Sequence, residues 1–267
     1  MVELVEERAG PESEIMVSRI GEGPPLVLIH GIGGGRWTWN PVIEDLANRY
    51  ELFIYDQRGH GSSRKPNQGY LLSDYAADLD LVLDHYGIDR PLILGHSLGG
   101  MVALEWATGQ TDRARALVIE DSPMHHGGEI ADELFANWIA LCQMSPEDAE
   151  AAYLEAFPEM DPDSAHARGL SITATALPVF TELRDFMLPR AGASVIATYR
   201  DIESPVLLVH GDVEQGGMVP VDDATAFTAT VCNGVAVRIP DGGHGLHDGK
   251  TEDFLATVVP FLAAHSQ

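Results

Sequence analysis

Basic residues are scarce in this chain, and their scarcity excludes several kinds of partner. Lysine and arginine together number 16 against 41 aspartates and glutamates, which gives a formal net charge of -25 over 267 residues. Only Lys65 and Lys250 are lysines. Because a nucleic-acid backbone or an anionic membrane would be repelled by such a surface, we expect neither as a partner.

Cysteine is also scarce, and long apolar runs are missing. The two cysteines, Cys142 and Cys232, form no Cys-x-x-Cys pattern, so we expect neither a disulfide framework nor a thiolate metal site. No stretch approaches the length of a membrane span, and residues 1–7 lack the basic start and apolar core of a signal peptide. These absences favour a cytoplasmic location.

Short apolar runs recur along the chain with helical segments between them. Runs rich in Val, Ile and Leu without polar alternation suit strands that are buried on both faces of a parallel sheet. The expected strands cover residues 26–30, 52–56, 92–95, 116–121, 206–210 and 235–239, preceded by an antiparallel hairpin of residues 4–8 and 15–20. The sequence therefore predicts an α/β fold with a mostly parallel central sheet, flanking helices and one substantial core.

Between Ser122 and Asp201 the short apolar runs typical of strands no longer recur. There the sequence predicts helices over residues 129–144, 146–157, 162–176 and 178–187, and prolines at or near three of the starts support this division. We therefore expect residues 1–122 and 202–267 to form a core domain and residues 123–201 to form a helical cap inserted into it.

A serine lies at the centre of the Gly-His-Ser-Leu-Gly segment at residues 95–99, directly after an expected strand and before a helix-like stretch from Met101 to Thr108. Glycines two positions on either side of a serine leave room for a sharp, strained turn that lifts the hydroxyl above the sheet. Ser97 is therefore the candidate nucleophile.

Two backbone amides are candidate donors to a developing oxyanion. Ile32 lies in the glycine-rich turn at residues 30–35, after the first long strand. Leu98 follows the serine at the start of a helix, where the helix dipole favours negative charge.

Near the other end of the chain, His244 lies in a glycine-rich loop after the last strand, and a neutral imidazole there can take the serine proton and return it to a leaving group.

These segments, in this order, resemble the α/β-hydrolase fold in its serine esterase and lipase form. The matching landmarks are residues 30–34, 56–63, 95–100 and 243–245. The resemblance implies a serine nucleophile, since an aspartate at position 97 would instead suggest dehalogenases or epoxide hydrolases. Within the second landmark we expect a structural role, with Asp56 and Arg58 tying the turn through charge-assisted hydrogen bonds.

The acid that orients His244 has two candidates, because the sequence departs from the commonest pattern of the resembled family. Glu214 occupies the position after the strand ending at His210, where that pattern has an aspartate. Asp121 follows the preceding strand, as in a subset of the family, and its shorter side chain makes it our preferred acid. Its neighbour Glu120 would point to the opposite face if the strand persists.

The expected activity is the hydrolysis of a small-molecule carboxylic ester or lactone, without cofactor or metal. Clustered histidines such as His125 and His126 match no ligand pattern with supporting carboxylates. Leu134, Trp138 and Phe180 of the cap are candidate substrate-binding residues, although an amphipathic helix buries an apolar face in any case. Two alternatives remain: hydrolysis of a carbon-carbon bond next to a ketone, and a ligand receptor that has kept the hydrolase fold.

Overall fold

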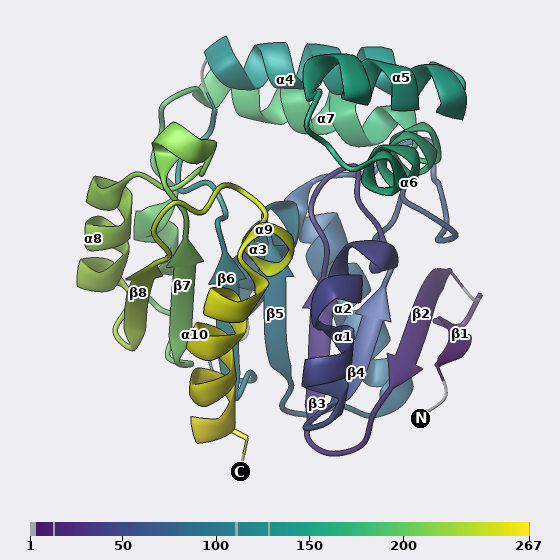
Figure 1. Ribbon diagram of the computed structural model, residues 1–267. Coiled ribbons are helices and arrows are strands. Elements are labelled where there is room, and N and C mark those ends of the chain that lie inside the picture. The colour runs from purple at the N-terminus through teal and green to yellow at the C-terminus, as the bar shows by residue number, and fades with distance from the viewer. Residues whose placement is uncertain (1–3, 13, 110–111, 128, 267) are drawn as a thin grey trace.

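An eight-stranded sheet forms the centre of the structure (Figure 1). The computed structural model describes residues 4–12, 14–109, 112–127 and 129–266. The strands are β1 (Val5–Ala9), β2 (Ile15–Ile20), β3 (Pro25–Ile29), β4 (Glu51–Tyr55), β5 (Leu92–His96), β6 (Ala116–Glu120), β7 (Val206–His210) and β8 (Gly234–Arg238). Their order is β1-β2-β4-β3-β5-β6-β7-β8. β2 is antiparallel to both of its neighbours, β1 and β4, and every neighbouring pair from β4 to β8 is parallel. The predicted fold class is confirmed.

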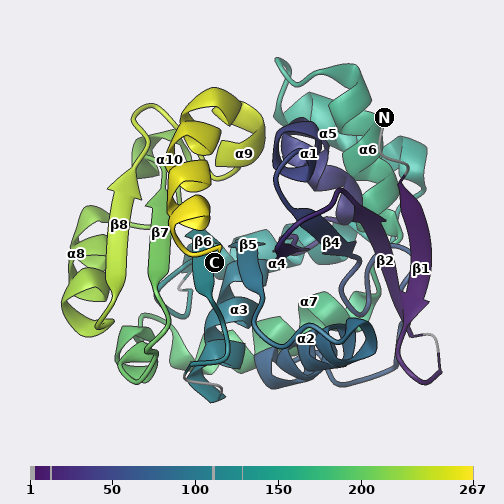
Figure 2. The same cartoon turned by 90° about the horizontal axis from the view of Figure 1, so that it is seen from below.

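Helices cover both faces of the sheet because side chains alternate along each buried strand. Leu26 and Leu28 of β3 pack in a cluster with one helical layer, and Val27 and Ile29 pack in a cluster with the other. The first layer contains α1 (Asn40–Ala47), α9 (Leu246–Gly249) and α10 (Thr251–Ala264), and the second contains α2 (Leu72–Tyr86), α3 (Leu98–Gly109) and α8 (Val221–Thr230) (Figure 2). Short 3-10 helices lie at Arg36–Trp39, Leu188–Arg190, Ile196–Tyr199 and Val213–Gln215.

One expectation about burial is wrong. The run at residues 235–239 suggested a strand buried on both faces, yet β8 is the edge strand and Val235 is 50% exposed. The physical reason is position: an edge strand pairs with one neighbour only, so apolar β-branched residues can serve strand formation there without full burial.

Four helices lie between β6 and β7, above the carboxyl ends of the strands (Figure 1). They are α4 (Glu129–Leu141), α5 (Pro146–Ala156), α6 (Pro162–Thr173) and α7 (Leu177–Met187). Ser145 and Asp161 cap the starts of α5 and α6, since their side chains accept hydrogen bonds from Asp148 N at 3.1 Å and Ser164 N at 2.9 Å. The helix starts lie within one residue of those expected, while the division of the chain into core and cap domains stays a prediction.

Hydrogen bonds join these helices to the loops beneath them. The Glu182 carboxylate of α7 accepts from the amides of Gly69 at 3.1 Å and Tyr70 at 3.0 Å, and the Ala176 amide donates to the Gly59 carbonyl at 2.7 Å. Helix α7 therefore covers the loops beyond the carboxyl ends of the parallel strands. None of the helices in the described ranges is both long and apolar enough to cross a membrane.

Candidate active site

A single residue, Ser97, connects β5 to α3. Its φ of 53° lies in the left-handed region that non-glycine residues seldom occupy. Two hydrogen bonds hold this conformation: the Ser97 amide donates to the Glu120 carbonyl at 2.9 Å, and the Ser122 hydroxyl donates to the Ser97 carbonyl at 2.8 Å. The backbone strain expected of the turn is therefore present at the serine itself.

The glycines around Ser97 are required by close backbone contacts. A Cβ atom at Gly99 would overlap the Ile29 carbonyl oxygen of β3, and one at Gly95 would overlap the Gly99 carbonyl oxygen. The start of α3 therefore lies directly against β3 and β5, which a larger residue at either position would prevent.

The glycine-rich turn after β3 lies against the serine. A Cβ atom at Gly31 would lie 2.9 Å from Nδ1 of His96 and 3.2 Å from Cβ of Ser97. Within the described part of the chain, no hydrogen bond engages the backbone amides of Ile32 and Leu98. The amide of Leu98 also belongs to the first turn of α3, where helical N–H groups have no partner inside the helix.

Asp121 and His244 are brought together by the fold. Asp121 is fully buried directly after β6, and its Oδ2 lies 2.8 Å from Nδ1 of His244. The carboxylate also accepts from the amides of Met218 at 2.8 Å and Gly211 at 3.3 Å, so its orientation is fixed. An ionised carboxylate can only accept, and His244 therefore carries a proton on Nδ1 and leaves Nε2 free. The other candidate acid, Glu214, is exposed in the 3-10 helix after β7.

The residue before the serine holds the His244 loop. Nε2 of His96 donates to the His244 carbonyl at 3.0 Å, and the two imidazole rings lie 4.6 Å apart between centroids. Burial lowers the pKa of His96 to about 3, so this ring is neutral at ordinary pH. The contact places the loop that carries His244 directly over the elbow that carries Ser97.

A second carboxylate–imidazole pair, which sequence reasoning missed, lies beside the first. Oε1 of Glu120 accepts from the amides of Leu246 at 2.7 Å and His247 at 2.9 Å, and the carboxylate lies 2.8 Å from Nδ1 of His247. Glu120 is the last residue of β6, and Asp121 leaves the strand with a φ of 42°, so strand alternation does not set their relative directions. The signal available in the sequence was a carboxylate directly before Asp121 together with a histidine three positions after His244.

Attraction outweighs desolvation in this buried pair. Burial by itself would raise the pKa of Glu120, yet the neighbouring imidazoles of His247 and His96 and the hydrogen bonds from His247 hold it below its ordinary value. Burial would likewise lower the pKa of His247, but Glu120 raises it above its ordinary value. The pair is thus an ion pair that anchors the segment after His244 to the end of β6.

An apolar cluster joins the helices above the sheet to the candidate oxyanion turn. Phe180 is fully buried in it, Phe135 and Leu98 are buried, and Trp138 and Ile32 pack against it partly exposed. The Trp138 and Phe180 rings lie 6.1 Å apart between centroids, and a Cβ atom at Gly33 would lie 4.0 Å from Cζ of Phe180. Leu134, the third candidate cap residue, is half-buried on α4.

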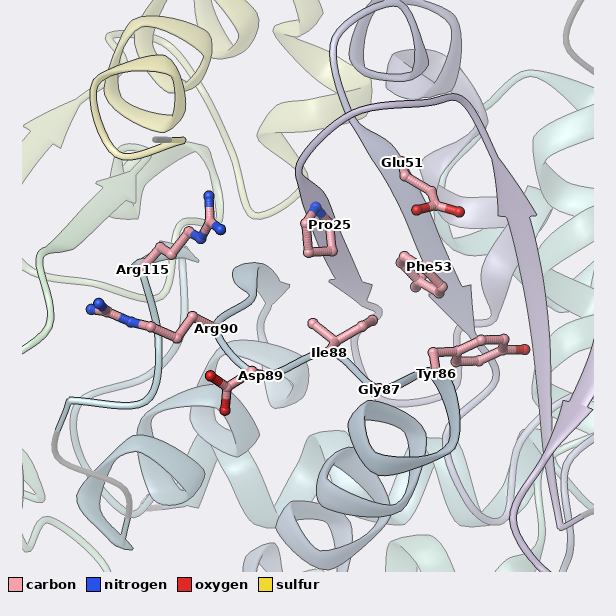
Figure 3. A pocket seen from close by; sticks show the side chains of 9 residues that line it. All are labelled: Pro25, Glu51, Phe53, Tyr86, Gly87, Ile88, Asp89, Arg90 and Arg115. Atoms are coloured by element: carbon pink, nitrogen blue, oxygen red, sulfur yellow. The ribbon is translucent and has the colours of Figure 1, made fainter.

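Cavities also lie away from these groups in the described part of the chain. One cavity of about 390 Å³ lies at the opposite edge of the sheet, beside the starts of β3 and β4 (Figure 3). Its lining residues are Pro25, Glu51, Phe53, Tyr86, Gly87, Ile88, Asp89, Arg90 and Arg115. The cavity lies at the amino ends of the parallel strands, whereas Ser97 follows the carboxyl end of β5. The cavity and the serine are therefore separated by the length of a strand.

The remaining histidines form no metal site within the described ranges, where no group of three or more His, Cys, Asp or Glu side chains is arranged to hold an ion. His125 pairs with Asp223 at 2.9 Å, and His126 contacts the ring of Phe186 at 5.6 Å between centroids.

Comparisons with known proteins agree with this architecture. The family model of the α/β hydrolase fold matches residues 24–152. The chain is 29% identical over 255 residues to the 2-(acetamidomethylene)succinate hydrolase of Mesorhizobium japonicum, a match that covers 91% of this chain and 90% of that protein. The crystal structure of E-2-(acetamidomethylene)succinate hydrolase has a TM-score of 0.80 at 24% identity and covers 98% of this chain and 100% of that chain.

A second solved structure, of an N-acyl homoserine lactone degrading enzyme, has a TM-score of 0.75 at 22% identity and covers 95% of this chain and 99% of that chain. With the sheet order and the elbow, these matches show that the chain has the α/β-hydrolase fold.

The Glu120–His247 pair makes stability depend on pH in a defined way. Replacing Glu120 by Gln is expected to lower the free energy of unfolding by about 1.5–3 kcal/mol, because bonds to a charged carboxylate become bonds to a neutral amide. The lowered pKa of Glu120 stabilises the fold at pH values above 4.5, the ordinary pKa of a glutamate. The raised pKa of His247 stabilises the fold at pH values below 6.5, the ordinary pKa of a histidine. The difference between wild type and variant should therefore be largest between these values.

Urea unfolding across the pH range measures this difference. It should shrink as the pH falls through the folded-state pKa of Glu120 and as it rises through that of His247. Glu214→Gln, at an exposed position, serves as the matched control and should leave stability unchanged. A difference that does not vary with pH would contradict an ion pair.

Proposed function

We propose that this protein is a serine hydrolase that cleaves an uncharged carboxylic ester or lactone without a cofactor. The observation that carries the proposal is the 2.8 Å contact between Asp121 and His244, beside a serine held in the left-handed region. A buried carboxylate that fixes the imidazole tautomer, together with a serine hydroxyl on a strained turn, is the arrangement that activates a serine.

In the proposed reaction the Ser97 hydroxyl oxygen attacks the acyl carbon while Nε2 of His244 takes its proton. The carbonyl oxygen becomes an oxyanion that accepts hydrogen bonds from the amides of Ile32 and Leu98. His244 then protonates the leaving alcohol, and an ester to Ser97 remains. Water attacks this ester with His244 as base, which releases the acid and returns the proton to Ser97.

The apolar cluster above the turn supports an uncharged substrate. Phe135, Trp138 and Phe180 bring aromatic rings towards the amides that would bind the oxyanion, and these rings offer no cation to an acidic group. The net charge of -25 disfavours anionic substrates further.

Carbon-carbon bond hydrolysis is the second candidate. The similarity to 2-(acetamidomethylene)succinate hydrolase raises a separate possibility, a dicarboxylate substrate. A succinate portion carries two carboxylates, which would need cationic partners at the site. In this chain Arg184 of α7 is paired with Asp132 at 2.6 Å, and Arg190 lies 4.2 Å from the ring centroid of Phe186. This pairing supports the ester and lactone proposal over a dicarboxylate substrate.

Ser97→Ala should abolish ester and lactone turnover and labelling by a fluorophosphonate while the melting temperature stays near that of wild type, because only the nucleophile is lost. Hydrolysis of a panel of nitrophenyl esters of increasing chain length, and of lactones, measures the activity. Ser73→Ala, at an exposed position on α2, is the matched control. Near wild-type turnover in Ser97→Ala would refute the nucleophile, and labelling followed by no sustained turnover in the wild type would favour the receptor reading.

Asp121→Asn should lower kcat by about three to four powers of ten, because the amide no longer fixes the tautomer that presents Nε2 of His244. Glu214→Gln should have little effect, since that side chain is exposed. The measurement compares the steady-state kcat of the two variants, each divided by the fraction of enzyme that a fluorophosphonate labels. A steep loss in Glu214→Gln with an active Asp121→Asn would reverse the assignment.

Leu134→Ala and Trp138→Ala should change the relative activity on short and bulky esters by a larger factor than they change the melting temperature. Phe180→Ala should also alter substrate choice, but its side chain is fully buried, so a loss of about 3–5 kcal/mol in stability should accompany it. Ratios of kcat/KM across the ester panel, set beside thermal unfolding, separate the two effects. An equal loss on every ester would show that these residues serve only the packing of the helices.

A further inference from the structure

The turn that carries Ile32 is held by two buried histidines from different segments. Nδ1 of His30 donates to the Gly31 carbonyl at 2.7 Å, and the Gly34 amide donates to the same oxygen at 3.2 Å. The Gly33 amide donates to Nε2 of His60 at 3.1 Å. A peptide unit is planar, so each of these bonds fixes the direction of a whole plane on one side of Ile32.

The protonation of His60 is determined by its second partner. Nδ1 of His60 lies 2.9 Å from the Arg58 carbonyl, and a carbonyl only accepts, so the proton resides on Nδ1. Nε2 therefore has a lone pair, which the Gly33 amide requires. Burial lowers the pKa of His60 to about 3, in keeping with a neutral ring.

The Arg58 carbonyl is itself held in place. The Arg58 guanidinium makes two bonds of 2.6 Å to the buried Asp78 carboxylate of α2, and the Gly59 amide donates to the Arg64 carbonyl at 2.8 Å. The structural role expected for the segment at residues 56–63 thus ends in a contact with the candidate oxyanion turn, which the sequence pattern did not suggest.

We propose that His60 is a positioning residue of the oxyanion turn: it engages the Gly33 amide, fixes the peptide plane after Ile32, and leaves the Ile32 amide as the free donor to the oxyanion. This inference rests on the proposed serine hydrolase activity. Without the acceptor on His60, the partly buried Gly33 amide would lose its partner, and rotation of its peptide would disturb the turn that positions the neighbouring Ile32 amide.

Two substitutions separate the two bonds of His60. Asparagine places its amide nitrogen near the position of Nδ1, so His60→Asn keeps a donor for the Arg58 carbonyl and loses the acceptor for Gly33. Glutamine places its amide oxygen near the position of Nε2, so His60→Gln keeps the acceptor. We expect kcat to fall about 100-fold in His60→Asn with KM nearly unchanged, and to fall less than about tenfold in His60→Gln.

The diagnostic measurement compares an oxoester with the matching thionoester, whose sulfur is a weaker hydrogen-bond acceptor. Wild type should prefer the oxoester strongly, His60→Asn should lose most of that preference, and His60→Gln should keep it. The preference is a ratio within one preparation, so partial unfolding leaves it unchanged. His85→Asn, at an exposed histidine of α2, is the matched control.

An unchanged preference in His60→Asn would overturn the inference, whether or not its kcat falls, because a purely structural role lowers both rates equally. Equal losses in the asparagine and glutamine variants would overturn it as well. Failure of the proposed function is recognised separately: in that case wild type hydrolyses neither ester, or Ser97→Ala hydrolyses both.

Discussion

The contact between the start of α3 and the backbone of β3 is the constraint on which the candidate site depends. Gly99 allows α3 to lie against the Ile29 carbonyl, and this closeness forces the reversal of direction that Ser97 accommodates with a positive φ. The turn after β3 also lies close to the serine, since a Cβ atom at Gly31 would lie 3.2 Å from Cβ of Ser97. Nucleophile and candidate oxyanion donors thus share one packing contact.

Two adjacent carboxylates at the end of β6 hold the histidine loop. Asp121 contacts the imidazole of His244, while Glu120 holds the backbone and side chain of His247 beyond it. Glu120 is the last residue of the strand, and Asp121 turns out of it with a φ of 42°. Orientation of the proposed base and anchoring of its loop are therefore separate tasks, carried by separate carboxylates.

Neutral imidazoles play a different part at the other side of the serine. His30 and His60 are fully buried, and each donates from Nδ1 to a backbone carbonyl while its Nε2 accepts from a backbone amide. Their rings meet edge to face at 5.0 Å between centroids. A buried ring with both nitrogens engaged thus joins two backbone groups by hydrogen bonds beyond the ends of the strands.

The order of strands and helices, the elbow at Ser97 and the loop of His244 could be predicted from the sequence, because each depends on short-range signals: apolar runs, glycine spacing and helix starts. The exposure of β8 could not, since the edge position of a strand depends on the order of the whole sheet. The His60 contact with Gly33 and the Glu120 contact with His247 join segments 27 and 127 residues apart. No local pattern specifies such pairs.

The choice between Asp121 and Glu214 shows the same division. Sequence alone determined that an acid had to follow one of two neighbouring strands, since both end at the edge where His244 lies. Tertiary structure decided which carboxylate meets the imidazole. Asp121 lies buried between the ends of β6 and β7, where the amides of Gly211 and Met218 aim it at a histidine 123 residues away, whereas the turn after β7 leaves Glu214 in solvent.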